Sequence, residues 1–146
     1  MATNPFLFSL IGWLVPGGGY WLLKRKNQFL FYLFTVLVLF AAGIMLRGGL
    51  LWPEPEDLTG MDNVTSLLMK GSAAAKIFAG VPYLLALFGG YSQTFLDGFK
   101  YDMGTKLLVL AGLFNLLALA DAFSLAFPEK KPAAVADAAR KDDKKK

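Results

Sequence analysis

The chain contains neither cysteine nor histidine among its 146 residues. Without cysteine there can be no disulfide, no thiolate metal site and no lipoprotein anchor. Without histidine as well, ordinary zinc, iron–sulfur and haem sites are excluded, as are Ser-His-Asp and Cys-His catalysis. Chlorophyll or haem ligation by histidine is ruled out too, although an unusual amide ligand remains open. We therefore expect no cofactor held by those groups, no metal and no enzyme activity.

Charged residues are also scarce, at 18% of the chain, whereas apolar residues make up 55%. A soluble domain is nearer a quarter charged. The apolar excess lies in four segments, residues 6–23, 29–46, 77–93 and 107–127. Because a span needs about 20 apolar residues, the pattern predicts an all-α polytopic membrane protein. The last three segments are its firm transmembrane helices, and the first is a broken fourth span or a re-entrant segment.

This reading divides the chain into a helical membrane domain, residues 1–127, and a Lys/Ala-rich flexible tail, residues 128–146. A polar loop at 47–72 interrupts the membrane domain. Within that loop, Asp62 is placed to N-cap a helix that leads into the third span. In that helix Lys76 is expected to snorkel. Residues 91–106 read as an amphipathic connector along one membrane face.

The first apolar segment is interrupted by Pro16, Gly17, Gly18 and Gly19. Proline lacks a backbone donor and glycine is a poor helix former, so a helix breaks here. Lipid cannot hydrogen-bond the freed backbone groups, so the break must be satisfied inside protein or lie at an interface. The glycines lack the spacing of a phosphate-binding loop. We therefore expect a packing or lipid contact.

Three consecutive cations, Lys24, Arg25 and Lys26, follow the break. They predict a topology and interface anchor, and contact with an anionic lipid headgroup is the alternative. With three crossings, this cluster shares one face with residues 100–106. The remaining cations and the tail occupy the other face. The positive-inside rule then favours a cytoplasmic tail by ten cations to five.

Two polar residues of the last span stand out. Asp121 is an intramembrane carboxylate, for which a structural or interfacial role competes with proton or ion handling. Asn115 is expected to hydrogen-bond another helix, and Gly112 beside it to permit close helix packing. The 13 phenylalanines and three tryptophans are suited to contact lipid, carotenoid or another pigment. Nothing in the net charge of +4, which comes mostly from the tail, indicates nucleic acid.

Two short stretches, the Pro-Gly break and the helix from Gly112 to Ala122, carry a resemblance. The chain resembles uncharacterised small bacterial membrane proteins that share a "PGxGxxYLG" break and a "GLxNLLxxxDA" helix. It is more distantly similar to a small two-helix membrane domain of the TM-two type. The resemblance implies a bacterial inner (cytoplasmic) membrane location and no particular activity.

These observations favour a non-catalytic accessory subunit. It would stabilise or help assemble a larger membrane complex, with respiratory and photosynthetic complexes both open. Its partners would be integral membrane subunits and lipids. The alternatives are a small channel or transporter that uses Asp121 and the Pro-Gly break, and a membrane enzyme that uses carboxylates and lysines.

Overall fold

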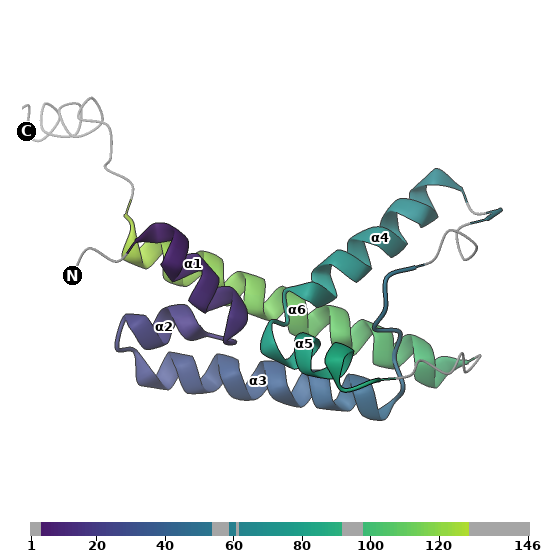
Figure 1. Ribbon diagram of the computed structural model, residues 1–146, viewed down its shortest axis with the longest axis horizontal. Coiled ribbons are helices and arrows are strands. Elements are labelled where there is room, and N and C mark those ends of the chain that lie inside the picture. Colours follow the sequence, from purple (N-terminus) through teal and green to yellow (C-terminus); the bar gives the residue numbers. More distant parts are fainter. Residues whose placement is uncertain (1–3, 54–58, 61, 92–97, 129–146) are drawn as a thin grey trace, which may run out of the picture.

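A computed structural model describes residues 4–53, 59–60, 62–91 and 98–128. Within these ranges every regular element is an α-helix (Figure 1). In chain order the helices are α1 (Pro5–Leu14), α2 (Gly18–Leu22), α3 (Lys26–Met45), α4 (Asn63–Ile77), α5 (Val81–Phe88) and α6 (Phe99–Ala126). The predicted tail, apart from Pro128, lies outside the described residues.

Two antiparallel helices form the frame of the molecule, and both are long and apolar enough to cross a membrane. Helix α3 has 20 residues and α6 has 28, which correspond to lengths of about 30 and 42 Å. Their contact surface buries Val36 and Phe40 of α3 against Leu108 and Ala111 of α6. Because α6 is longer than the roughly 30 Å bilayer core, its polar first turns extend beyond it.

Helices α1 and α2 form a hairpin, so the first apolar segment is not one continuous helix of the length that a span needs. Asn4 accepts a hydrogen bond from the Phe6 N–H and caps the start of α1. After ten residues, or about 15 Å, the chain turns and α2 folds back along α1. A Cβ on Gly18 would lie 2.7 Å from the Ile11 carbonyl oxygen, so the two helices are in direct backbone contact. The structure therefore supports the re-entrant alternative.

The predicted third firm span, residues 77–93, is wrong as a continuous helix. Helix α4 ends at Ile77 and α5 begins at Val81, with a bend of 101° between them. The helix breaks because Gly80 adopts a left-handed φ of +72° and Pro82 in the first turn of α5 offers no backbone donor. The described residues thus hold two firm spans, or three if the bent pair counts as one.

The predicted start of the helix that follows the polar loop is confirmed. Helix α4 begins at Asn63, and the side chain of Asp62 accepts a hydrogen bond from the Thr65 N–H. The cap therefore satisfies one of the donors that a helix start leaves free.

The beginnings of α1 and α3 and the end of α6 lie together at one end of the molecule, which we call the tail end. There the ring of Phe8 contacts that of Phe127 at 5.7 Å between centroids, and Tyr20 of α2 stacks on Tyr32 of α3 at 5.2 Å. The opposite end, where α3 ends and α4 and α6 begin, is called the loop end (Figure 1).

The helices of the described ranges form two similar units in opposite orientation. Each unit is a broken helix pair followed by one long helix, namely α1–α2–α3 and then α4–α5–α6. The first pair enters from the tail end and the second from the loop end, so the two breaks meet in the middle (Figure 1). An inverted repeat of this kind is known in membrane transporters. In this chain, the arrangement of the two units places Pro5 and Phe127 at the same end of the molecule (Figure 1).

This arrangement corrects two predictions about the membrane faces. The cations Lys24–Lys26 lie at the tail end, whereas Lys100 and Lys106 lie at the loop end. Between the two groups only α3 runs the length of the molecule, because the bent pair α4–α5 turns back toward the loop end (Figure 1). The predicted connector at 91–106 is not a separate surface element, since residues 99–106 are the first turns of α6. Asp97, which belongs to that connector, lies outside the described residues.

Candidate functional site, the Asn115 junction

The side chain of Asn115 lies where the two broken helices meet. It is 1% exposed. Its Nδ2 donates to the Trp13 carbonyl of α1 at 3.0 Å and to the Phe78 carbonyl after α4 at 2.8 Å. Its Oδ1 accepts from the Gly17 N–H at 3.1 Å. The expected hydrogen bond from Asn115 to another helix is confirmed, and it extends to two helix breaks.

The chemistry of the two breaks accounts for this choice of side chain. The last carbonyls of a helix have no partner within that helix, and in hydrocarbon no water can supply one. An amide carries two donors and an acceptor on one small group. Both donors of Asn115 go to helix-terminal carbonyls, and its acceptor takes the N–H freed by the Pro-Gly break. We call Asn115 and these three backbone groups the Asn115 junction.

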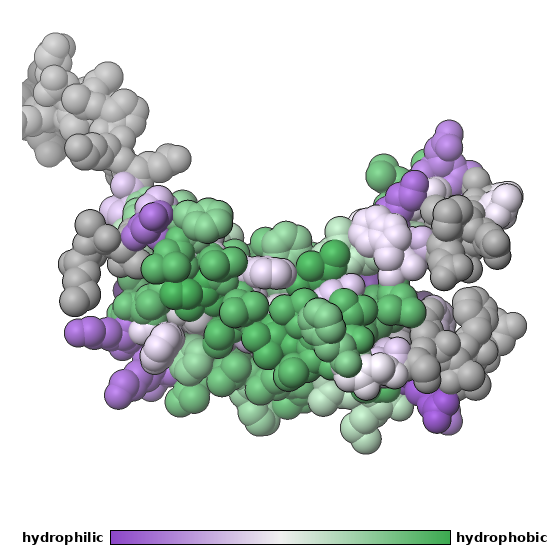
Figure 2. Space-filling view, viewed as in Figure 1, coloured by the Kyte–Doolittle hydropathy of each residue, from purple (hydrophilic) through white to green (hydrophobic). Residues whose placement is uncertain are grey.

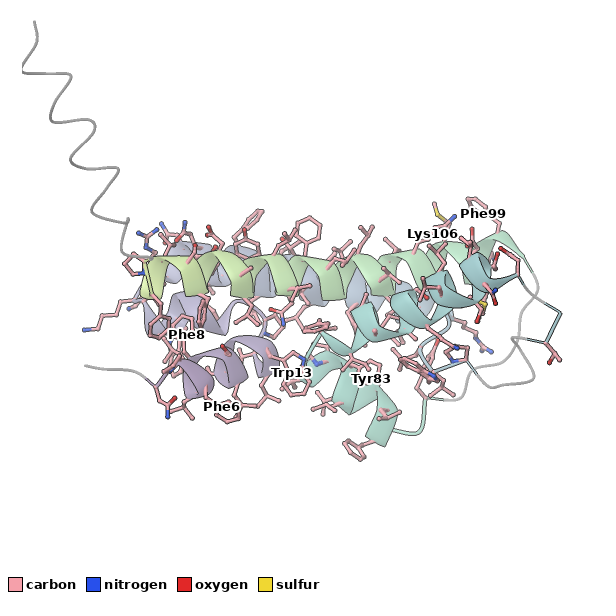
Figure 3. All side chains as sticks on the ribbon, turned by 90° about the horizontal axis from the view of Figure 1, so that it is seen from above. Phe6, Phe8, Trp13, Tyr83, Phe99 and Lys106 are labelled. Carbon is pink, nitrogen blue, oxygen red and sulfur yellow. The ribbon has the colours of Figure 1, made fainter. Side chains whose placement is uncertain are left out.

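The two breaks also contact each other directly. Trp13 Nε1 donates to the Ile77 carbonyl at 3.2 Å, so α1 binds the end of α4. A Cβ on Gly80 would overlap the Trp13 carbonyl oxygen and lie 2.6 Å from that of Leu14. Figure 3 shows Trp13 at the inner end of α1, pointing toward the second broken pair. Glycine is therefore required at position 80 both by its φ and by this close approach.

The Pro-Gly break is buried in the protein and not at an interface. Gly17, Gly18 and Gly19 are each buried. A Cβ on Gly19 would lie 2.6 Å from the Cβ of Ala122 in α6, so the third glycine lets α2 pack onto α6. Pro16 borders an apolar groove of about 480 Å³ beside α3 that also reaches Pro82. These contacts support the expected packing role of the break.

Asp121 lies apart from the Asn115 junction. It accepts a hydrogen bond from the hydroxyl of Tyr20, and this bond fastens α2 to α6 near the tail end. Tyr20 itself is 1% exposed, whereas Asp121 is exposed. Asp121 therefore lies beside the end of the break, where Gly19 packs on Ala122, and its hydroxyl partner Tyr20 directly follows the break.

Small residues bring α4 and α6 together as predicted. A Cβ on Gly112 would overlap the Ala75 carbonyl oxygen, so the two helix backbones touch there. Ala79 and Ala111 are also buried. Gly71, Ala75 and Ala79 are spaced four residues apart along α4 and the turn that follows it, but Gly71 has nothing within 4 Å of its Cβ position. The close packing therefore ends before the outer half of α4.

A second polar cluster lies at the loop end, and little in the sequence indicates it. Lys76 does not snorkel to the surface. It is 4% exposed and donates to the Gly49 carbonyl at 2.7 Å. The Gly49 N–H in turn donates to Thr105 Oγ1 at 2.8 Å, and the Tyr91 hydroxyl donates to the Gly48 carbonyl. An uncharged stretch of two glycines after α3 thus anchors α4 and α6.

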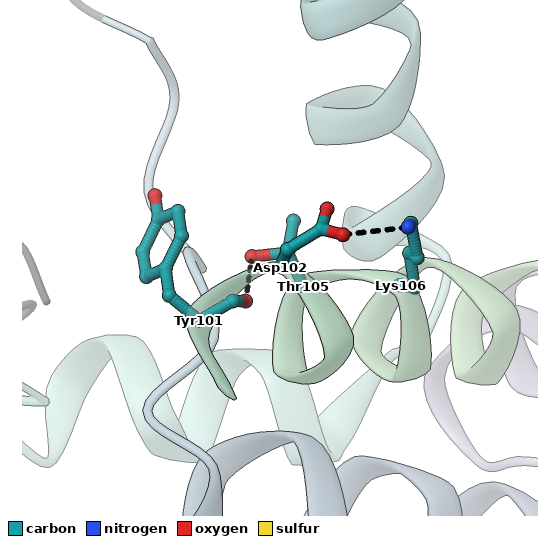
Figure 4. A network of polar contacts seen from close by, with 4 residues as sticks. All are labelled: Tyr101, Asp102, Thr105 and Lys106. Carbon is teal, nitrogen blue, oxygen red and sulfur yellow. Dashed lines mark hydrogen bonds and ion pairs between the residues drawn. The ribbon is translucent and has the colours of Figure 1, made fainter. Parts of the chain in front are cut away.

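The first turns of α6 are held by local contacts (Figure 4). Thr105 Oγ1 donates to the Tyr101 carbonyl at 2.8 Å. Lys106 pairs with Asp102 at 2.6 Å, four residues earlier on the exposed helix surface. Asp102 is therefore engaged with a cation. The described residues hold no cluster of three or more acidic or other metal-binding side chains.

The comparison with protein families bears on this whole helical assembly. A model described as a family of unknown function (DUF6677) matches residues 7–133. The chain belongs to the DUF6677 family. No curated protein and no solved structure matches the chain. The match covers all of α2 to α6, α1 from Leu7 onward and the Asn115 junction, and it agrees with the resemblance to uncharacterised proteins.

In this DUF6677 chain, α4 leans away from α6 toward the loop end and leaves a groove of about 540 Å³ between them. One wall carries Leu68, Met69 and Ser72, and the other carries Thr105 and Val109. The outer turns of α4 expose large apolar side chains, of which Leu68 is 74% exposed. Figure 2 shows this helix projecting above an apolar surface. We call this feature the α4–α6 groove.

Proposed function

We propose that this member of the DUF6677 family is a non-catalytic accessory subunit that packs against a larger membrane protein complex. The observation that carries the proposal is the α4–α6 groove. Its walls combine leucine and valine with Thr105 and Ser72. Both hydroxyls donate within the chain, Thr105 to the Tyr101 carbonyl and Ser72 to the Met69 carbonyl. The groove is also lined by the exposed ion pair of Asp102 and Lys106, which a partner helix carrying a few polar side chains would match and an acyl chain would not.

The rest of the molecule is consistent with a rigid docking element. Every buried side-chain nitrogen or oxygen within the described residues has a hydrogen-bond partner. The Asn115 junction fixes the inner ends of both broken pairs, so the lean of α4 is set by the fold. We propose a respiratory or photosynthetic complex as the kind of assembly in which such a subunit would serve.

The absence of cysteine makes a direct test possible. A single cysteine at Leu68 lies in the α4–α6 groove, and one at Leu117 of α6 is a matched control on another exposed apolar surface. Each variant is cross-linked in native membranes, extracted in mild detergent and analysed by mass spectrometry. We expect Leu68→Cys to capture one stoichiometric membrane partner and Leu117→Cys to capture none. A parent protein that purifies alone as a monomer would count against the proposal.

We also propose a bacterial inner-membrane location with the tail end in the cytoplasm. Lys24–Lys26 lie at the tail end, and the segment 129–146 that follows Pro128 adds seven cations, against five cations elsewhere in the chain. The positive-inside rule therefore favours a cytoplasmic tail end. Single cysteines at Asn27 and Asn63 test it with an impermeant maleimide. Only Asn63→Cys should react from outside intact cells, and the reverse labelling would invert the orientation.

Transport is the second candidate function, and one observation favours it. Two broken helices that enter from opposite ends and meet midway are a transporter arrangement. However, the apolar groove beside the breaks is lined by side chains such as Pro16, Leu37 and Pro82, which offer an ion no ligand. Flux measurements in liposomes separate the candidates. Transport requires flux in the parent protein that Asp121→Asn abolishes, whereas the subunit function predicts no flux.

A further inference from the structure

The basic turn between α2 and α3 has properties that neither the packing of the bundle nor the α4–α6 groove explains. Lys24, Arg25 and Lys26 are all exposed. Within the described part of the chain, none of them pairs with a carboxylate, since the ion pair found there joins Lys106 and Asp102 at the opposite end. Arg25 reaches only the neutral amide of Gln28, at 3.3 Å.

Among the described residues, the loop end has no run of consecutive cations, since its exposed Lys70 and Lys100 lie on the separate helices α4 and α6. There Lys106 is neutralised by Asp102, and Lys76 is buried on the Gly49 carbonyl. The tail end therefore concentrates positive charge that the described part of the protein leaves uncompensated. A charge of this kind, at a helix turn beside an apolar bundle, attracts an anion from outside the protein.

The backbone holds the turn in one conformation. The Lys24 N–H donates to the Trp21 carbonyl at 3.0 Å and the Arg25 N–H donates to the Tyr20 carbonyl at 2.9 Å. These two bonds form the Schellman motif that ends many helices. The motif requires a left-handed residue, and here Lys24 occupies that position with a φ of +59°.

A lysine at this position is unfavourable, because glycine avoids the steric cost of a left-handed backbone. The same motif after α5 does use glycine, since Gly90 has a φ of +71° and the Tyr91 N–H donates to the Ala86 carbonyl. The chain therefore places a cation where its own fold favours glycine. The motif after α3 also has a cation there, since Arg47 has a φ of +53° and the Gly48 N–H donates to the Gly43 carbonyl. What points to a ligand at the turn between α2 and α3 is therefore its three consecutive cations and the surface beside them.

The surface next to the turn is suited to hydrocarbon. The residues 24–28 line an open cleft of about 480 Å³. Below it, α3 carries an exposed stripe of Leu30, Phe31 and Phe34, which lie on one helix face at spacings of three and four. Trp21 is exposed as well, and tryptophan favours the headgroup level of a bilayer. A cationic cleft above an apolar stripe matches the two ends of one lipid.

We propose that the turn formed by Lys24, Arg25 and Lys26 is a binding site for the headgroup of an anionic phospholipid, whose acyl chains lie along the exposed stripe of α3. The phosphate is the group recognised. A phospholipid is the occupant rather than free phosphate because the apolar stripe continues directly from the cationic cleft.

The test compares lipid retention by purified full-length protein. The protein is mixed with equal amounts of phosphatidylglycerol and phosphatidylcholine in detergent, and native mass spectrometry counts the bound molecules. A variant with Lys24, Arg25 and Lys26 changed to glutamine should lose its preference for phosphatidylglycerol by on the order of 100-fold, about fivefold for each cation removed. A variant with Lys70, Lys100 and Lys106 changed to glutamine, at the loop end, should keep the preference.

A further variant separates lipid binding from a merely structural role. Lys24→Gly removes one cation and also relieves the left-handed strain. We expect its thermal midpoint to rise while its preference for phosphatidylglycerol falls about fivefold. If Lys24 served only to end the helix, Lys24→Gly would raise the thermal midpoint and leave the preference for phosphatidylglycerol unchanged.

Three results would overturn the proposal. The parent protein could retain the two lipids equally, which would make the turn an interface anchor only. The loop-end variant could lose the preference as strongly as the tail-end variant, which would remove the site. Inorganic phosphate could displace the bound lipid at millimolar concentration, which would make free phosphate the ligand. Circular dichroism of each variant confirms that the comparison is made between folded proteins.

Discussion

The side-chain amide of Asn115 donates a hydrogen bond of 3.0 Å to the Trp13 carbonyl and thereby completes the inner end of α1. The same amide completes the inner end of α4 through the Phe78 carbonyl. One residue of α6 thus satisfies two helices that stop within the bundle. Without this arrangement, neither broken pair could leave its terminal carbonyls in an apolar environment.

Replacing Asn115 by leucine should destabilise the protein substantially. Three hydrogen bonds are lost, which leaves two carbonyls and the Gly17 N–H unpaired and at about 1 kcal/mol for each bond amounts to about 3 kcal/mol. Asn115→Asp should cost more, because its carboxylate would face two carbonyl oxygens. Unfolding in detergent with increasing denaturant measures the change. Asn63→Leu, at an exposed position on α4, is the control, and an equal loss in both variants would refute the role of the junction.

Gly112 and Gly71 form a matched pair that tests the contact between α4 and α6. A Cβ at Gly112 would overlap the Ala75 carbonyl oxygen, whereas a Cβ at Gly71 meets nothing within 4 Å. Gly112→Ala should therefore force the helices apart at a cost of about 1–3 kcal/mol. Gly71→Ala should gain up to about 1 kcal/mol from helix propensity. Thermal unfolding of both variants checks the opposite signs, and two losses of similar size would show that the outer half of α4 also packs closely.

The sequence is sufficient to predict the membrane class, the two long spans and the helix start at Asp62, because these depend on local composition and capping. It also identifies Asn115 as a residue bonded to another helix, because a lone amide in an apolar span needs a partner. Which groups it bonds could not be predicted, since they belong to breaks that are distant in the chain.

The break at Gly80 is the feature that the sequence leaves undecided. The run from 77 to 93 is uncharged and almost long enough to cross a bilayer, and membrane helices tolerate both glycine and proline. The left-handed turn follows from contact with Trp13 of another helix, which is not a local property. Because of that break, Lys24 and Lys100 lie at opposite ends of the molecule and do not share one face as predicted.

The N-cap of α4 should depend on pH. The Thr65 side-chain hydroxyl donates to the carboxylate of Asp62. This bond and that of the Thr65 backbone N–H hold the pKa of Asp62 below its usual range. Because the folded-state pKa is lowered, the cap is fully present above the unfolded value of about 3.9. It is lost as the pH falls through the folded-state pKa.

We therefore expect amide exchange at Thr65 and Ser66, corrected for intrinsic rates, to become faster as the pH falls below about 4. The variant Asp62→Asn is the appropriate comparison, because asparagine caps a helix about as well as aspartate and does not titrate there. Its corrected exchange should stay constant over the same pH range. Equal acceleration in the two proteins would mean that α4 frays for another reason.

Lys76 and Lys70 lie on the same helix but should differ in reactivity. Lys70 is exposed, whereas Lys76 is 4% exposed and donates to the Gly49 carbonyl at 2.7 Å. An amine-directed ester reaches Lys76 only when the contact between α4 and the chain after α3 opens, so its labelling should be slower by on the order of tenfold or more. Mass spectrometry of the labelled protein over time gives both rates.

The packing of α4 on α6 provides the control for this difference between the lysines. Gly112→Ala pushes α4 off α6, so it should speed labelling of Lys76, whose protection depends on that contact, and leave that of Lys70 unchanged. Equal rates for the two lysines in the parent protein would place Lys76 at the surface and remove the anchor at Gly49.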